Sequence, residues 1–98
     1  MSDISINQAY ERMNRDLLVD VREDSEVAAG RIPTAIHIPL GELSARLGEI
    51  DRSRDVIAVC RSGNRSSRAT ALLRSAGYTV DNMTGGMMAW QAAGLPTV

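Results

Sequence analysis

The 98-residue sequence predicts an α/β fold in which helices flank a central parallel sheet on both faces. The first observation is that short apolar runs of strand length alternate with segments of helical periodicity. The second is that "VIAVC", residues 56–60, is continuously apolar and rich in β-branched side chains, as in a strand covered on both faces. Strands that alternate with helices in this way form a parallel sheet.

A capped helix and two strands are expected in the first part of the chain. Ser5 and Gln8 have the spacing of a capping box, which predicts a helix there. Its apolar face contains Ile6, Ala9, Tyr10 and Met13. Residues 17–21 and 35–39 are short β-rich runs, and we expect a strand at each. Between them, residues 25–30 predict a helical turn that ends at a glycine.

The alternation continues to the end of the chain. One face of a helix is marked by Leu40, Leu43, Leu47 and Ile50, and residues 51–55 then form a polar turn. After the 56–60 strand, a second helix ending at Gly77 is predicted by the stripe Ala69, Leu72, Leu73 and Ala76. Residues 78–83 predict a last strand and residues 85–94 a short helix.

Composition and charge exclude several classes of function. We expect one domain over residues 1–98, since this length can bury a modest core without a metal or a disulfide. A net charge of −1 gives no electrostatic basis for binding nucleic acid or an anionic membrane, and no apolar run is long enough to span a membrane. All eleven basic residues are arginines, so phosphate-loop lysine and Schiff-base chemistry are excluded, and we expect no cofactor.

The sequence has few side chains that could ligate a metal or form a disulfide. One histidine and one cysteine are too few for a zinc site, so no metal is expected. A single cysteine cannot form an internal disulfide, and the polar N-terminus is not a signal peptide. We therefore expect a cytoplasmic protein and, given its small size, a monomer.

The chemistry is expected after the 56–60 strand. In open α/β sheets ligands bind at the carboxyl ends of strands, and Cys60 stands at such an end, about six residues before the next helix. The positive end of that helix, with Arg61 and Arg65, favours a thiolate, so we expect a lowered Cys60 pKa. Gly63 permits a positive φ, which lets the backbone N–H groups turn toward a small anion.

These features identify the residues of the candidate site. Ser66 and Ser67 are expected to cap the helix and donate hydroxyls toward the thiolate. Cys60 is the predicted catalytic nucleophile. The predicted anion-binding loop contains Arg61, Ser62, Gly63, Asn64, Arg65 and Ser66.

Two anion chemistries compete for such a loop. A cysteine phosphatase needs arginine six positions after the cysteine, where this chain has Ser66, and the arginine comes one position earlier at Arg65. The shorter loop suits one extra sulfur atom on Cys60 better than a phosphoryl group. A phosphatase or arsenate reductase is therefore disfavoured.

The chain resembles rhodanese-type sulfurtransferase domains. The matching segments are "LLVDVRE", "GRIPTAIHIP", "VCRSGNRS" and "MTGGMMAW", in the family's order, from about residue 17 to 96. The resemblance implies a parallel sheet of about five strands and a six-residue loop, Cys60 to Arg65, whose cysteine carries a persulfide. Arg31 and Thr34 depart from the family, which often has His and Gly there, but both lie away from the loop in sequence.

The resemblance also implies a reaction. A small anionic donor such as thiosulfate would pass sulfur to Cys60, and cyanide or a thiol would accept it, with Arg61 and Arg65 holding the donor. The alternatives are a sulfur-relay module that serves a protein acceptor and a non-catalytic protein-binding domain, which the intact loop disfavours.

Other polar and apolar residues have plainer interpretations. Arg65 could form a surface salt bridge instead of binding an anion, and Arg68 is expected on a solvated face. Asp20 and Arg22 are expected to brace loops. His37 is expected to be packed or half-exposed and not to act as a base. Most of Met83, Met87, Met88 and Trp90 should be core, with one or two on an apolar rim near Cys60.

Overall fold

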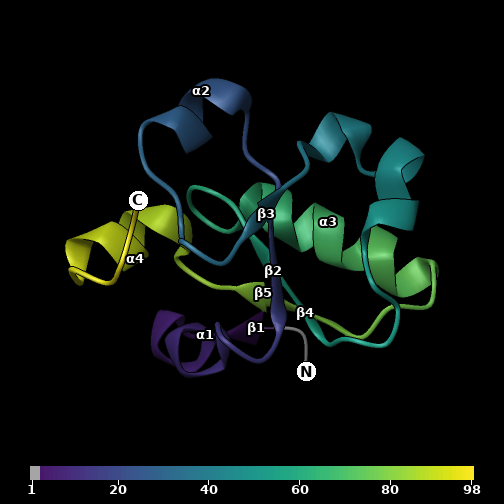
Figure 1. Ribbon diagram of the computed structural model, residues 1–98, viewed down its shortest axis with the longest axis horizontal. Helices are drawn as coiled ribbons and strands as arrows, with labels where there is room; N and C mark the ends of the chain where they lie inside the picture. The colour runs from purple at the N-terminus through teal and green to yellow at the C-terminus, as the bar shows by residue number, and fades with distance from the viewer. Residues whose placement is uncertain (1–2) are drawn as a thin grey trace.

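The computed structural model describes residues 3–98 and contains a five-stranded parallel sheet (Figure 1). The strands are β1 (Asp3–Ile4), β2 (Leu17–Asp20), β3 (Ile36–His37), β4 (Val56–Val59) and β5 (Val80–Met83). Their order is β1-β5-β4-β2-β3, so β4 is central. The first two residues of the predicted 1–98 domain lie outside the described residues.

Helices cover both faces of the sheet, as the strand and helix alternation predicts (Figure 1). One face packs against α3 (Asn64–Ser75) and two short 3-10 helices, η1 (Leu40–Glu42) and η2 (Ser44–Glu49). The other face packs against α1 (Ile6–Arg12) and α4 (Gly86–Ala92). The short helix α2 (Asp24–Ala28) follows the carboxyl end of β2.

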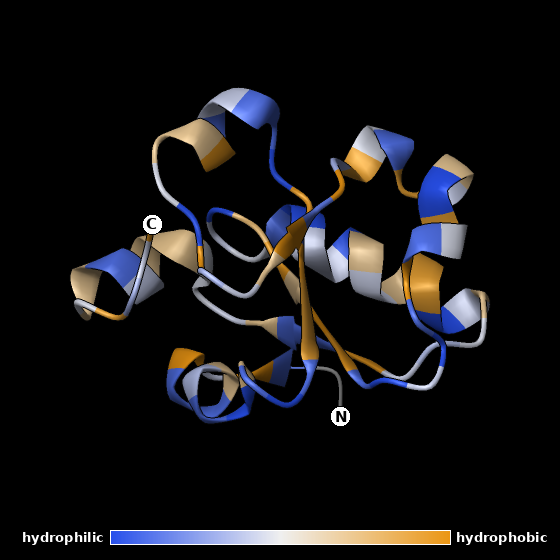
Figure 2. Ribbon diagram, in the orientation of Figure 1, coloured by the Kyte–Doolittle hydropathy of each residue, from blue (hydrophilic) through white to orange (hydrophobic). Residues whose placement is uncertain are grey.

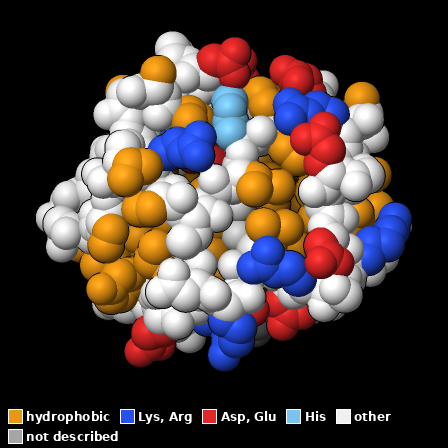
Figure 3. Space-filling view, in the orientation of Figure 1, with side chains coloured by type: hydrophobic (Ala, Val, Ile, Leu, Met, Phe, Trp, Pro, Cys, Tyr) orange, Lys and Arg blue, Asp and Glu red, His pale blue; other side chains and the backbone are white. Residues whose placement is uncertain are grey.

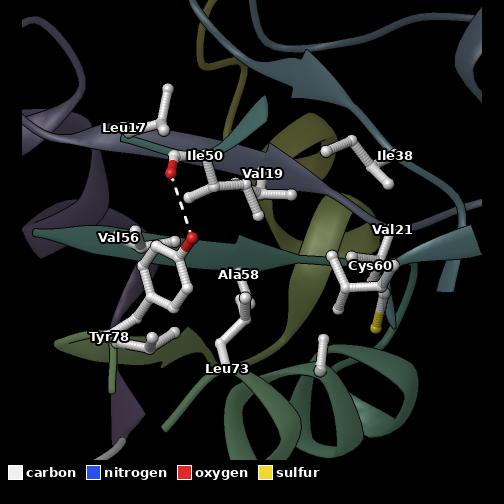
Figure 4. Packing of buried hydrophobic residues seen from close by; sticks show 13 residues of the cluster. Leu17, Val19, Val21, Ile38, Ile50, Val56, Ala58, Cys60, Leu73 and Tyr78 are labelled. Carbon is white, nitrogen blue, oxygen red and sulfur yellow. Dashed lines mark hydrogen bonds between the residues drawn. The ribbon is translucent and has the colours of Figure 1, made fainter. Parts of the chain in front are cut away.

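The alternation of side chains along the strands divides the core into two clusters. Figure 2 shows β2 and β4, two inner strands of the sheet, as mostly hydrophobic, whereas β5 also contains hydrophilic residues. On β4, Val56 and Ala58 face α3, and Ile57 and Val59 face α1 and α4. Continuing this alternation places Cys60 on the α3 side, at the end of a row of buried side chains (Figure 4). The strand pattern therefore directs the thiol toward the helix that follows it.

Most of the expected elements are present, with three corrections. The capping box of Ser5 and Gln8 is confirmed, although Tyr10 on the expected apolar face is 45% exposed. The helix expected around residues 40–50 is two 3-10 helices with a kink at Arg46, because glycines within this segment disfavour a continuous α-helix. β1 was not predicted: two residues are too short to show a periodicity, and pairing with β5 defines them.

Among residues 3–98, no helix combines the length and the apolar character that crossing a membrane would require.

Candidate active site

Cys60 lies directly after β4, at the carboxyl edge of the sheet, and is 1% exposed. Figure 4 shows its sulfur directed toward α3. The backbone N–H of Gly63 donates to Sγ at 3.0 Å, and the Ser66 hydroxyl lies 3.3 Å from Sγ. The thiol is therefore buried, but it faces polar groups of the loop and not hydrocarbon alone.

The loop is shorter than expected because α3 begins at Asn64, four residues after Cys60. Gly63 is the N-cap residue, with φ of 110°, a conformation that glycine adopts at little cost. The expectation that Ser66 and Ser67 cap the helix is wrong: both lie inside its first turns. Of the two serine hydroxyls expected to face the sulfur, that of Ser66 contacts it, whereas Ser67 is exposed.

The pKa of the Cys60 thiol is lowered, as predicted. Burial raises this pKa, but hydrogen bonds from the Ser66 hydroxyl and from the backbone of Ser66, Gly63 and Ser62 outweigh the burial. Arg61 and Arg65, which were predicted to lower this pKa, are not among its main causes. The local geometry thus favours a thiolate, the form of cysteine that acts as a nucleophile.

The N-terminus of α4 holds the other side of the loop. Met87 and Met88 donate backbone N–H groups to the carbonyl oxygens of Cys60 and Arg61, at 2.8 and 3.0 Å. Because a trans peptide directs its N–H opposite to its C=O, these contacts turn the following N–H groups away from α4. A Cβ on Gly86, whose φ is +58°, would overlap the backbone of Cys60 and Arg61. Close approach of α4 to the loop therefore requires glycine there.

Arg65 forms an ion pair with a residue of α2, a helix that lies much earlier in the sequence. Its guanidinium forms a two-point ion pair with Glu26 of α2, at 2.6 and 2.7 Å. The hydrogen bonds from Arg65, against an opposing effect of burial, lower the Glu26 pKa to about 2. The structure thus shows the salt bridge that was the alternative to anion binding by Arg65, and the role of this arginine toward a substrate stays a prediction.

The expected bracing by Asp20 and Arg22 is confirmed. Arg22 is buried, pairs with Asp20 at 2.8 Å, and donates to the carbonyl oxygens of Glu26, within α2, and of Gly30, just after it. These contacts fix α2 on the end of β2. Arg22 therefore supports the position from which Glu26 reaches Arg65.

A cavity of about 260 Å³ lies beside the loop, between α2 and α4. Its lining includes Arg61, Glu26, Met88 and Gln91. Arg61 is exposed, as is Met88, which has 51% of its surface accessible. On this side of the molecule, where α4 lies, hydrophobic side chains reach the surface (Figure 3).

The remaining predicted residues are placed as follows. Met83, Met87 and Trp90 are core residues and Met88 is exposed, in agreement with the expected core and rim. Ser62 and Asn64 are exposed in the loop, and Arg68 is exposed on α3. His37 is half-buried and is the pale blue side chain of Figure 3. Its Nε2 lies 2.7 Å from the carbonyl oxygen of Arg22, and its Nδ1 lies 3.7 Å from Oδ1 of Asp24. These contacts agree with a packed histidine.

Three residues that contact the loop were not predicted from the sequence: Glu26, Asn82 and Gly86. Each lies shortly after or near the carboxyl end of a strand, and such ends meet at one edge of a parallel sheet. That rule offered a signal for Glu26 and Gly86. Asn82 is a polar residue inside an apolar strand, which is a signal of a buried hydrogen-bonding role.

The fold and the loop together define a class: a parallel α/β domain with a single cysteine held by backbone N–H groups at the carboxyl edge of its sheet. Comparison with known proteins points to one family. The model of the rhodanese-like domain matches residues 5–93. A protein of Allochromatium vinosum named sulfurtransferase is 43% identical over 95 residues, which cover 96% of this chain and 89% of that protein.

Solved structures give the same result. A rhodanese-related protein from Thermoplasma volcanium has a TM-score of 0.95 at 31% identity, covering 100% of this chain and 98% of that chain. A rhodanese-like domain protein from Staphylococcus aureus has a TM-score of 0.86 at 31% identity, covering 92% of this chain and 91% of that chain. The chain belongs to the rhodanese-like domain family.

Proposed function

We propose that this protein is a sulfurtransferase in which Cys60 carries sulfur as a persulfide. The observation that carries the proposal is the hydrogen bond from the Gly63 N–H to Sγ, next to the Ser66 hydroxyl. The Gly63 N–H stabilises negative charge on sulfur, and the Ser66 hydroxyl can do so when its proton turns toward the sulfur. A thiolate is required for attack on a sulfur donor. Its relative from Allochromatium vinosum is named a sulfurtransferase, which supports the same reaction.

The proposed reaction has two steps. The Cys60 thiolate attacks the outer sulfur of thiosulfate, the S–S bond of thiosulfate breaks, and sulfite leaves with the bonding electron pair. Cyanide or a thiol then attacks the outer sulfur of the persulfide, and the Cys60 thiolate is regenerated. Each step moves one sulfur atom and needs no oxidant, reductant or metal ion.

Arg61 is the residue best placed to bind the anionic donor. Its side chain is exposed and lines the cavity beside the loop, whereas the Arg65 guanidinium already binds Glu26. We propose that Arg61 attracts the donor and that Arg65 holds the end of the loop. The backbone N–H groups from Ser62 to Ser66 would stabilise the persulfide anion.

A thiosulfate and cyanide assay on the wild type and on Cys60→Ala tests the proposal. Steady thiocyanate formation that Cys60→Ala abolishes is the expected result. Slow turnover with a stable Cys60 persulfide would indicate the relay function, in which a partner protein accepts the sulfur. Turnover that persists in Cys60→Ala, or no sulfur uptake at all, would contradict the proposal.

A further inference from the structure

Asn82 links the buried hydroxyl beside Cys60 to the edge of the sheet. It is 6% exposed on β5, and its Oδ1 accepts a hydrogen bond from the Ser66 hydroxyl. Its Nδ2 donates to the Asp3 carboxylate at 3.3 Å and to the Gly63 carbonyl at 3.4 Å. Neither the reaction above nor the anion-binding loop assigns a role to this side chain.

The Ser66 hydroxyl has one proton and two neighbours that can accept it. Asn82 Oδ1 is one acceptor, and the Cys60 sulfur is the other once it is ionised. When the thiol is neutral, its own S–H can donate to Ser66 Oγ while Ser66 donates to Asn82. When the thiol has lost its proton to water, the Ser66 proton can stabilise the sulfur only by turning away from Asn82.

We propose that Asn82 is a positioning residue that competes with the Cys60 sulfur for the Ser66 proton and thereby sets how readily the thiol ionises. The inference rests on the proposed role of Cys60 as the nucleophile. Asn82 does not touch the sulfur, so it acts through Ser66. A residue that only packed the core would have no reason to accept this particular proton.

A test of this inference must leave the other charged groups near the thiol unchanged, because each of them can shift the thiol pKa. The charged side chains on the elements around it are Arg61 of the loop, Arg65, Arg68 and Arg74 of α3, Asp24 and Glu26 of α2, the Asp20–Arg22 pair at the end of β2, Asp81 of β5 and Asp3 of β1. Helix α4 carries none. Replacement of Asn82 by leucine leaves all of these charges in place.

Asn82→Leu is also compatible with folding. Leucine has a similar size and cannot hydrogen-bond. Three groups lose Asn82 as a hydrogen-bond partner. The Gly63 carbonyl oxygen still accepts from the N–H of Ser67 at 3.1 Å, and the Ser66 hydroxyl still has the Cys60 sulfur as a partner. The Asp3 carboxylate is exposed to water. No buried polar group loses its last hydrogen bond, so the large cost of an unsatisfied group is avoided.

The experiment is the pH dependence of iodoacetamide alkylation of Cys60, followed by mass, in a double-mutant cycle of Asn82→Leu and Ser66→Ala. We expect Asn82→Leu to lower the apparent pKa of the thiol, so that alkylation at acidic pH becomes several-fold faster. Ser66→Ala should raise that pKa, and adding Asn82→Leu to Ser66→Ala should change nothing further. Asn7→Leu, an exposed change on α1, is the matched control.

Several results would overturn the inference. A purely structural Asn82 predicts the opposite sign, because a loosened loop would withdraw the N–H groups and raise the thiol pKa. An equal effect of Asn82→Leu with and without Ser66 would also contradict it. Should Asn82→Leu not fold, as judged by circular dichroism, Asn82→Asp replaces it: a carboxylate must raise the thiol pKa more in the presence of Ser66 than in Ser66→Ala. Alkylation needs no sulfur donor, so failure here is distinct from failure of the proposed function, which sulfur uptake tests.

Discussion

Glu26 and Arg65 join α2 to the first turn of α3 through two hydrogen bonds of 2.6 and 2.7 Å. Arg65 is the second residue of α3, directly after the loop that begins at Cys60. Arg22 fixes α2 on the end of β2, so the end of the loop is held by contacts that start in a different strand. This relationship makes the geometry around the thiol depend on residues outside the cysteine motif.

The ion pair predicts a specific pH dependence of stability. The Glu26 pKa is lowered from its ordinary value of 4.5 to about 2, chiefly by hydrogen bonds from Arg65. A carboxylate whose pKa is lowered by folding contributes stability that is fully present above the ordinary pKa and is lost as the pH falls through the folded value. The difference in free energy of unfolding between wild type and Glu26→Gln should therefore be constant above about pH 5 and shrink toward about pH 2.

Urea unfolding across this pH range measures that difference. Glu42→Gln, which removes a carboxylate from an exposed ion pair with Arg46 far from the loop, is the control for loss of charge. A difference between wild type and Glu26→Gln that does not change with pH would contradict the role given to this pair.

Substitution of Gly86 should disturb the loop from the side of α4. A Cβ there would overlap the backbone of Cys60 and Arg61, and the positive φ alone costs a non-glycine residue about 1–3 kcal/mol. We expect Gly86→Ala to lower the free energy of unfolding by at least that amount and to slow alkylation of Cys60. Gly48→Ala, where a Cβ meets nothing within 4 Å, should leave the alkylation rate unchanged.

Breaking the buried Asp20–Arg22 pair should cost far more than breaking an exposed pair. Arg22 would be left as a buried charge with only carbonyl partners, so Asp20→Asn is expected to destabilise the protein by about 3–5 kcal/mol. Arg46→Gln, at an exposed pair, should cost much less, because solvent screens its charges. Thermal or urea unfolding of the two variants compares them, and similar losses would show that the buried pair does not brace α2.

Arg61 should affect binding of the donor and not the stability of the loop. Loss of a hydrogen bond to a charged group is worth about 1.5–3 kcal/mol, so Arg61→Gln is expected to raise KM for thiosulfate by about tenfold or more. Arg68→Gln changes an exposed arginine of α3 and should leave KM unchanged. If the two variants behave alike, the donor is not held by Arg61.

The sequence predicts the sheet and the position of the thiol well because both follow from periodicity. Strand alternation along residues 56–60 determines the face toward which Cys60 points, and the helical stripe of α3 follows directly. The place where α3 begins was predicted less well. Ser66 and Ser67 are good capping residues, but the positive φ of Gly63 lets the helix begin at Asn64, so the serines fall inside it.

The partners of the loop could not be predicted from local pattern. Glu26 meets Arg65, Asn82 meets Ser66, and Gly86 meets the backbone of Cys60 only because the sheet brings the ends of β2, β4 and β5 together. These contacts depend on tertiary packing between segments that are distant in sequence. Sequence spacing within the cysteine motif contains no information about them.

The most direct test is the intact mass of the protein after incubation with thiosulfate and removal of excess donor. Wild type should gain the mass of one sulfur atom, located on Cys60 by fragmentation, and should lose it again on addition of cyanide. Cys60→Ser should gain nothing. A wild-type protein that stays unmodified, or a sulfur adduct that also forms on Cys60→Ser, would contradict the assignment of Cys60 as the sulfur-carrying nucleophile.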